Sequence, residues 1–367
     1  MSPLGEQLAR RIRVAGPLSV AEYMAEALGN PQHGYYTQRD PFGLAGDFIT
    51  APEISQMFGE LLGAWCAAVW QSMGCPRPVR LVELGPGRGT LMGDALRATR
   101  KVEGFHDAID LHMVETSPVL RARQAEALRG AAARIAPTWH DLFDAVPAGP
   151  LLLVANELFD ALPIHQFAFH GGRWHERVVT LDPTENRFVF GLRAPGAVFA
   201  LATPPPVPRD GTVVEVCPAG ISLAAAIGHR VVRDGGAALI IDYGHDGSAF
   251  GESLQAVRRH RKHDVFGEPG TADLAAHVDF GALSRAARET GAAVCGPIAQ
   301  NTLLKRLGIH HRAAALARSA TPEQAADLRT ATERLLHLEQ MGTLFKAIVI
   351  AAPDLPVPPG FDETAAS

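Results

Sequence analysis

The sequence predicts an α/β protein built on a largely parallel sheet, and three observations support this fold class. Short apolar runs alternate with segments of helical periodicity between about residues 79 and 156. A glycine-rich turn joins the first of these runs to a helical segment. The run at 150–155 is apolar throughout, as in a strand buried on both faces of a sheet. The 367 residues suffice for one elaborated domain or two.

The strands expected in the parallel sheet are separated by helical segments. A helix is predicted from Thr90 to about Lys101. Two late strands should close the sheet as an antiparallel pair. The predicted strands are 79–85, 109–115, 133–136 (a weak pattern), 150–155, 236–242, 292–297 and 343–351.

Additional regions are predicted around this sheet. The sequence suggests an N-terminal helical cap with helices near 4–14, 19–28 and 53–73, and a β-rich insertion with a hairpin around Gly171-Gly172. A mostly helical accessory region is expected at 253–341, and an extended or disordered tail follows. The predicted domains are 1–75 (cap), 76–163 (first half of the sheet domain), 164–233 (insertion), 234–352 (second half) and 353–367 (tail).

Composition narrows the possible functions. The chain has 34 Lys and Arg against 39 Asp and Glu, a formal net charge of −5, which argues against general nucleic-acid binding. Its four cysteines are scattered and form no C-x-x-C pair, so neither a disulfide framework nor a metal site is expected. No secretory signal and no apolar run long enough to span a bilayer is evident, and we predict a cytoplasmic protein.

The glycine-rich turn, Val82-Glu-Leu-Gly-Pro-Gly-Arg-Gly-Thr-Leu-Met92, is the most informative motif of the chain. Its glycines, Gly85, Gly87 and Gly89, are spaced G-x-G-x-G. The dinucleotide fingerprint G-x-G-x-x-G would place its third glycine at Thr90, which argues against a nicotinamide dehydrogenase. An ordinary strand–helix turn of a flavodoxin-like domain is the other interpretation.

Two carboxylates flank this turn at positions that indicate the ligand. Glu83 would repel a phosphate but suits a ligand that carries an ammonium group. Glu115 ends the next predicted strand, where a carboxylate can accept hydrogen bonds from both hydroxyls of a ribose. S-adenosylmethionine has both groups and no phosphate, so it is the predicted cofactor.

Acidic clusters at three places could face the methyl acceptor. The first, Asn156-Glu157 with Asp160, follows the buried strand at 150–155, where ligands bind in doubly wound sheets. The second contains Asp47 and Glu53, although Glu53 could instead complete a capping box with Thr50. The third, Asp242-Tyr-Gly-His245, could merely orient a neighbouring loop. Paired carboxylates suit a guanidinium acceptor, because they can bind its planar fork.

Two histidines, His260 and His277, are further candidates. His260 lies in a basic run, 258–263, which usually forms a solvated helix face or loop. His277 has no evident partner in the sequence, and a structural hydrogen-bonding role is the favoured interpretation. Metal binding by either residue is not expected.

Five ordered motifs resemble the MidA-type class I methyltransferases, a family that includes a mitochondrial complex I assembly factor acting on arginine. The resemblance extends from about Pro17 to Ala351. It implies a Rossmann-like class I methyltransferase sheet with an N-terminal helical cap, a β-rich insertion and a helical accessory region. The motifs are 46–60, 82–92, 156–163, 241–244 and 276–280.

The resemblance also implies an activity and roles for individual residues. The implied reaction is symmetric dimethylation of an arginine in the 49-kDa (NuoD-type) subunit of respiratory complex I during assembly. Catalysis would involve Asn156, Glu157, Asp160, Asp47 and Glu53. The S-adenosyl-L-methionine site would use Glu83, Gly85, Gly87, Gly89, Glu115, Asp141, Leu142 and Asn156, the Asp141-Leu142 loop lying near the adenine.

Two other functions fit parts of the same pattern. The cap and insertion could enclose a small molecule as readily as a peptide, which would make the chain a small-molecule methyltransferase. A non-catalytic assembly chaperone could keep the fold without the chemistry, but Glu83 and Glu157 would then have no purpose. Neither the acceptor nor the oligomeric state follows from the sequence.

Overall fold

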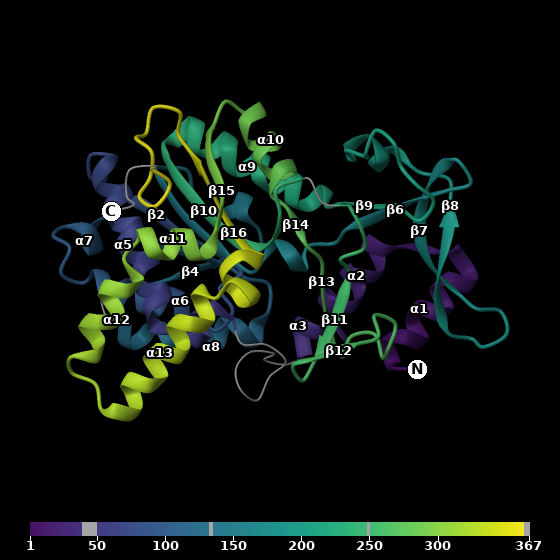
Figure 1. Ribbon diagram of the computed structural model, residues 1–367, viewed down its shortest axis with the longest axis horizontal. Helices are drawn as coiled ribbons and strands as arrows, with labels where there is room; N and C mark the ends of the chain where they lie inside the picture. The colour runs from purple at the N-terminus through teal and green to yellow at the C-terminus, as the bar shows by residue number, and fades with distance from the viewer. Residues whose placement is uncertain (39–49, 132–134, 248–249, 363–367) are drawn as a thin grey trace. The chain divides into compact units, whose positions relative to one another are not determined.

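The computed structural model describes residues 1–38, 50–131, 135–247 and 250–362 (Figure 1). The chain forms two compact units, each assembled from three separate segments. The larger contains Ile49–Leu158, Leu223–Gly244 and Phe280–Ser367, and the smaller contains Met1–Phe48, Phe159–Ser222 and His245–Asp279. The predicted cap at 1–75 does not coincide with either unit, because the helix over 56–72 belongs to the larger one.

The larger unit contains the mixed sheet that the sequence predicts. Its strand order is β15-β16-β10-β5-β2-β3-β4. Pairing is parallel from β10 through β5, β2 and β3 to β4, and antiparallel between β10 and β16 and between β16 and β15. The strands are β2 (Val79–Leu84), β3 (Ile109–Val114), β4 (Thr138–His140), β5 (Leu151–Asn156), β10 (Gly236–His245), β15 (Ala293–Ala299) and β16 (Phe345–Ala351).

One predicted strand was misplaced. The strand expected at 133–136 lies at Thr138–His140 instead, and residues 132–134 lie outside the described residues. Trp139 is the reason for this position, since its ring packs against the main core of the larger unit and its indole N–H donates to Gln124. The alanines of the predicted strand offer little apolar surface, so they stabilise a strand less than the packing of Trp139 does.

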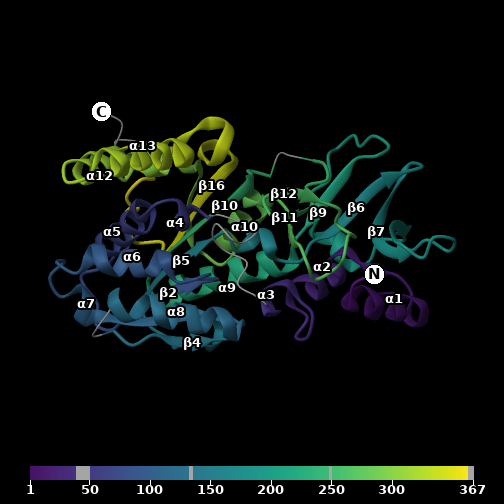
Figure 2. The ribbon, with the colours of Figure 1, turned by 90° about the horizontal axis from the view of Figure 1, so that it is seen from below.

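Helices of the larger unit cover the sheet. Helix α5 directly precedes β2, the first strand of this sheet along the chain. It has buried residues around most of its circumference, as expected for a helix enclosed by protein. Figure 2 shows α12 and α13 side by side. The helices are α4 (Ala51–Ile54), α5 (Gln56–Ser72), α6 (Thr90–Thr99), α7 (Phe105–Ala108), α8 (Pro118–Ala131), α9 (Pro218–Asp234), α10 (Phe280–Glu289), α11 (Gln300–Arg306), α12 (Ile309–Ala317) and α13 (Pro322–Leu336), with short turns η1 (Phe143–Ala145) and η4 (Leu338–Gly342).

The core of the larger unit lies on the central strands and reaches into the predicted tail. Strand β5 is buried throughout and β10 is buried from Gly236 to Asp242, which explains why both sequences are largely apolar. Phe361 belongs to the same core, and Arg306 Nη1 donates to the carbonyl oxygen of Gly360 over 3.1 Å. Of the two alternatives predicted for the tail, extended or disordered, these contacts argue against disorder at residues 353–362, which form neither helix nor strand.

The smaller unit combines antiparallel sheets with N-terminal helices. One sheet has the order β1-β7-β6-β9, with β8 paired to β7, and a second has the order β12-β11-β13. Its elements are α1 (Pro3–Ala15), β1 (Leu18–Ser19), α2 (Val20–Gly29), α3 (Tyr35–Gln38), η2 (Phe159–Ala161), β6 (His165–His170), β7 (Arg173–Leu181), β8 (Phe188–Arg193), η3 (Ala197–Leu201), β9 (Val213–Val216), β11 (Gln255–Arg258), β12 (Arg261–His263), β13 (Asp273–Ala275) and β14 (Val278–Asp279).

The hairpin predicted around Gly171-Gly172 is confirmed: it joins β6 to β7, with φ values of +58° and +79° at the two glycines. Two other local predictions need correction. The end of the insertion expected to be β-rich is helix α9, whose buried Ala224, Ile227 and Val231 follow helical spacing. The segment at 253–279 contains short strands joined by turns, and no helix is described within it.

The tight turn between β11 and β12 explains the second error. Arg259 and His260 both adopt positive φ values, +52° and +60°, where hairpin turns usually carry glycine or asparagine. The sequence therefore lacked the usual hairpin signal, and its basic residues suggested a helix face or loop. His260 is exposed at this turn. Among the helices that the structure describes, none is long and apolar enough to cross a bilayer.

Candidate functional site

The glycine turn connects the end of β2 to the start of α6. Gly85, Gly87 and Gly89 have φ values of +61°, +51° and +82°, a conformation that side chains with a Cβ rarely adopt. A Cβ at Gly85 would lie 2.8 Å from Leu158 Cδ1, and one at Gly89 would lie 3.1 Å from Gln124 Cα. Backbone conformation and close packing thus require glycine here.

Glu83 is a buried carboxyl group at the end of β2. The residue is 3% exposed, and its Oε2 has no hydrogen-bond partner in the described part of the chain. Burial raises the pKa of Glu83 to about 8, opposed only by a hydrogen bond from the Met92 amide. A cationic group next to Glu83 would favour the ionised carboxylate, so this position suits a positively charged ligand.

Glu115 directly follows β3 and has a partly satisfied carboxylate. Its Oε1 accepts from the Ser117 amide at 2.8 Å, and its Oε2 accepts from Gln124 Nε2 at 3.2 Å. Burial raises the pKa of Glu115, and these two donors, the Thr116 amide and the charge of Arg121 act against that rise. A carboxylate has about four lone-pair positions, so acceptor capacity remains for a ligand.

The loop after β4 contains the residues expected near an adenine. Asp141 is exposed and pairs with Arg121 Nη2 at 2.6 Å. Leu142 is 68% exposed. The Glu115 amide donates to the carbonyl oxygen of His140 over 3.0 Å, which joins this loop to the end of β3. Glu115 and Asp141 are thereby kept on neighbouring parts of one sheet edge.

Asn156 and Glu157 form the polar end of β5. Asn156 is 8% exposed and its Oδ1 has no partner among the described residues, while its Nδ2 donates to Glu157 Oε1 at 3.1 Å. The Ala51 amide donates to the same Glu157 oxygen at 3.0 Å. Burial raises the pKa of Glu157 to about 7. Glu157 also has a φ of +52°, a strained conformation that often occurs at functional sites.

Glu53 does not cap its own helix. Thr50 makes no side-chain capping bond, which contradicts the capping-box alternative. Glu53 Oε1 instead accepts from Thr90 Oγ1 at 2.5 Å, and its Oε2 lies 3.7 Å from Arg88 Nη1. Arg88 belongs to the glycine turn and Thr90 begins α6. Glu53 therefore connects α4 to both.

Three further acidic candidates have different outcomes. Asp47 lies outside the described residues, within 39–49. Asp160 belongs to the smaller unit, where its carbonyl oxygen accepts from the Ala276 amide at 2.9 Å. Asp242 is fully buried and accepts from the Leu158 and Tyr243 amides at 3.1 and 2.8 Å, which favours a role in orienting that loop.

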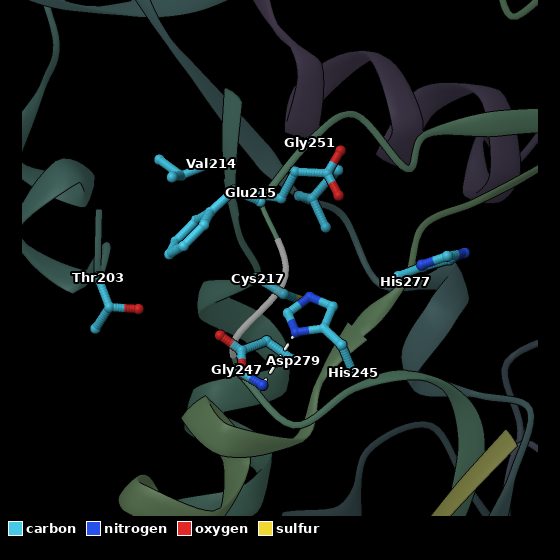
Figure 3. Close-up of a pocket in the computed structure, with 11 residues that line it drawn as sticks. Thr203, Val214, Glu215, Cys217, His245, Gly247, Gly251, His277 and Asp279 are labelled. Carbon is cyan, nitrogen blue, oxygen red and sulfur yellow. Dashed lines mark hydrogen bonds between the residues drawn. The ribbon is translucent and has the colours of Figure 1, made fainter. Parts of the chain in front are cut away.

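A cavity of about 40 Å³, lined by both polar and apolar side chains, lies within the smaller unit (Figure 3). His245 and His277 line it from different segments, together with Glu215 and Asp279. The His277 amide donates to Ser253 Oγ, 2.8 Å away, as expected for a residue with a structural role. Burial lowers the pKa of the His277 imidazole. Nowhere in the described ranges do three His, Cys, Asp or Glu residues form a group able to hold a metal.

The sequence analysis did not identify the residues that hold Glu115 in position. Gln124 and Arg121, both on α8, contact Glu115, and Trp139 contacts Gln124. Gln124 did leave a signal, because it lies between Leu120 and Leu128 at a spacing of four, on the buried face of its helix. No comparable signal marks Arg121.

The site combines a glycine turn after a parallel strand with two carboxylates, Glu83 before the turn and Glu115 after the next strand. This arrangement defines the class of protein, an α/β enzyme that binds a nucleoside. Residues 61–298 match the family described as "Putative S-adenosyl-L-methionine-dependent methyltransferase". The chain belongs to this family, and it is a methyltransferase that uses S-adenosyl-L-methionine. The predicted fold class, enzyme class and cofactor are thus confirmed.

Similar proteins agree with this membership. The zebrafish (Danio rerio) protein arginine methyltransferase NDUFAF7 is 40% identical, over 93% of this chain and 85% of its own length. The human protein of the same name is 39% identical, over 94% and 82%. A crystal structure from Burkholderia thailandensis, bound to S-adenosyl-homocysteine, has a TM-score of 0.83 and 29% identity, over 98% of this chain and 94% of that one.

These names correct one prediction. The zebrafish and human relatives are named as mitochondrial proteins, so the prediction of a cytoplasmic protein is contradicted. That prediction relied on the absence of recognisable targeting features, which says little about where a protein of this family works.

Proposed function

We propose that this enzyme methylates an arginine side chain of a protein, and that its acceptor is the 49-kDa-type subunit of respiratory complex I, modified during assembly. The observation that carries the proposal is the Asn156–Glu157 pair at the end of β5, where Glu157 has a pKa of about 7. The names of the zebrafish and human relatives, both protein arginine methyltransferases, support an arginine acceptor. The subunit is inferred from the resemblance of the motifs.

The donor site is assigned to residues whose polar groups fit S-adenosylmethionine. Glu83 offers a buried oxygen with no partner in the described residues, which suits the ammonium group of the donor. Glu115 retains acceptor positions for the two ribose hydroxyls, and the loop with Asp141 and Leu142 would lie near the adenine. The glycine turn allows close approach of the main chain. The bound donor supplies an electrophilic methyl group.

The acceptor site is assigned to Asn156 and Glu157. The Asn156 Oδ1, which lacks a partner in the described residues, can accept a hydrogen bond from a donor or acceptor N–H. An ionised Glu157 would bind the guanidinium, orient one nitrogen and receive the proton that this nitrogen releases on methylation. A pKa of about 7 suits a group that must alternate between the two states near neutral pH. Glu53 would support both sites through α4.

The test combines the purified enzyme, isotopically labelled S-adenosylmethionine and the 49-kDa-type subunit from the same organism. We expect label on one arginine of that subunit, located by peptide mass spectrometry, and none with a Glu157→Gln enzyme. Label on a different protein would overturn the acceptor. Transfer only to small molecules of a cell extract would overturn protein arginine methylation.

A separate variant tests the donor site without any acceptor. Gly87→Val places a β-branched residue at a φ of +51° in the turn. We expect it to abolish binding of S-adenosyl-homocysteine in calorimetry while the far-UV spectrum stays that of the parent. Normal affinity in a folded Gly87→Val enzyme would contradict the assignment of the turn.

A further inference from the structure

Gln124 is a buried polar side chain that the proposed chemistry does not use. It is 0% exposed and lies on α8 between Leu120 and Leu128, which are 2% exposed each. An apolar residue would fill this position on the buried face at lower desolvation cost. The choice of a carboxamide therefore needs an explanation in its contacts.

Three hydrogen bonds of Gln124 connect different parts of the proposed donor site. Gln124 Nε2 donates to the carbonyl oxygen of Gly87 at 2.8 Å and to Glu115 Oε2 at 3.2 Å. Gln124 Oε1 accepts from Trp139 Nε1 at 2.8 Å. Both amide protons and one oxygen lone pair are thus used, and the three partners come from the glycine turn, the end of β3 and β4.

Each contact restricts one group that the donor would meet. A trans peptide directs its C=O and N–H in opposite directions, so the bond to the Gly87 carbonyl turns the Arg88 amide away from Gln124. The bond to Glu115 Oε2, together with the bond from the Ser117 amide to Oε1, holds both oxygens of this carboxylate in place. The bond from Trp139 fixes which end of the carboxamide faces the turn.

We propose that Gln124 is a positioning residue for the methyl donor: its carboxamide sets the orientation of the Gly87 peptide and of the Glu115 carboxylate, and so determines donor affinity. The proposal rests on the donor site assigned above. It requires no contact between Gln124 and the donor, since Gln124 acts through Gly87 and Glu115.

Methionine at position 124 keeps the length of the side chain and removes its hydrogen bonds. We expect Gln124→Met to raise the Kd for S-adenosyl-homocysteine, measured by calorimetry, by roughly tenfold or more, as for loss of a hydrogen bond to a charged group. The KM for the acceptor should change less than twofold. The matched control is Gln300→Met, since Gln300 is also 0% exposed and its Nε2 donates to the Leu335 carbonyl, away from the donor residues.

A Kd within twofold of the parent in a folded Gln124→Met enzyme would overturn the proposal. An equal loss of affinity in Gln300→Met would also overturn it, because the effect would then be general loosening of the unit. A third variant, Glu115→Gln, tests the donor site independently of the role of Gln124. If that variant binds normally, the donor site itself is misassigned; if it binds weakly and Gln124→Met does not, only the role of Gln124 is wrong.

Gln124→Glu provides a second readout if the methionine variant does not fold. An ionised carboxylate there would face the Gly87 carbonyl and Glu115 with no proton to donate, whereas a protonated one regains one donor. The ratio of its Kd to that of the parent should fall as the pH is lowered from 8 to 6. A ratio independent of pH would contradict the proposed hydrogen bonds.

Discussion

The Ala51 amide donates a hydrogen bond to Glu157 Oε1 across 3.0 Å, and two residues further along α4 Glu53 accepts from Thr90 Oγ1 at 2.5 Å. One short helix therefore contacts the carboxylate at the end of β5 and the start of α6 after the glycine turn. A change in the position of α4 would alter both places together. Through α4, the donor site and the acceptor site proposed above would be coupled.

Replacement of Glu157 by glutamine tests the acceptor side. Glu157→Gln keeps the two hydrogen bonds to the side-chain oxygen but cannot accept a proton, so kcat should fall by roughly 100-fold or more. The Kd for S-adenosylmethionine should stay within twofold. In the parent, kcat/KM should decline as the pH falls below about 7, because protonation removes the charge of Glu157. Steady-state kinetics from pH 5.5 to 8.5 would check this, and an unchanged kcat in the variant would remove Glu157 from the chemistry.

Donor binding should release a proton through Glu83. With a pKa of about 8, this buried carboxyl is mostly protonated at pH 7 in the free enzyme. A bound ammonium group favours the carboxylate, so the proton leaves on binding. Titrations in two buffers of different ionisation enthalpy should show net release at pH 7, reduced in Glu83→Gln. Identical apparent enthalpies in both buffers would argue against the linkage.

Glu83 and Glu157 should contribute less to the stability of the free enzyme as the pH rises from about 4.5 to 8. Burial raises the pKa of Glu83 to about 8 and of Glu157 to about 7, so these two groups bind more protons in the folded chain than in the unfolded chain. Their contribution is complete below the unfolded pKa and disappears as the pH passes the folded values. In thermal unfolding, the Tm of the parent should therefore fall with rising pH relative to that of a double variant, Glu83→Gln with Glu157→Gln. A Tm difference between parent and variant that does not fall over this range would contradict these shifts.

Glu60 on α5 forms a buried ion network with arginines of α6 and α12. Its carboxylate, 3% exposed, contacts Arg97 Nη1 at 2.9 Å and Arg312 Nε at 2.7 Å, whereas the arginine side chains are 39% and 38% exposed. Replacing both arginines by methionine leaves the buried carboxylate of Glu60 without a cationic partner. This should lower the free energy of unfolding by about 3 kcal/mol or more at pH 7. Glu60→Gln should cost less, since water can solvate the arginines. Urea unfolding would measure both, and the reverse order would contradict this account.

The sequence was most informative where local pattern and final environment agree. The glycine turn, the apolar strands and the helix after Thr90 follow from backbone sterics and periodicity, and the polar pair after β5 follows from topology. Positive φ at Arg259 and His260, without glycine, gave no such signal, so the β11–β12 hairpin was missed. Local rules suggest turns only where residue type and conformation coincide.

Long-range partners were beyond local reasoning for another reason. Glu60 stands out as a charge in an apolar helix, but Arg312 is 252 positions away. Glu53 likewise offers a local capping partner, Thr50, and instead contacts Thr90, 37 positions away. Local spacing ranks nearby partners first, and tertiary packing decided otherwise in both cases.

The smaller unit also constrains the order in which this chain can fold. Its main core combines Leu4, Leu8 and Val20 with residues as distant as Leu274 and Ala276. A ribosome adds about 5–20 residues per second, so the N-terminal helices wait tens of seconds for their final partners. Until then the apolar face of α1 can pack only on earlier parts of this core, such as Val20 and Val179, while the β2–β5 part of the sheet can already assemble. The core of the smaller unit is therefore incomplete until Leu274 and Ala276 are made, and a fragment ending before residue 276 should aggregate.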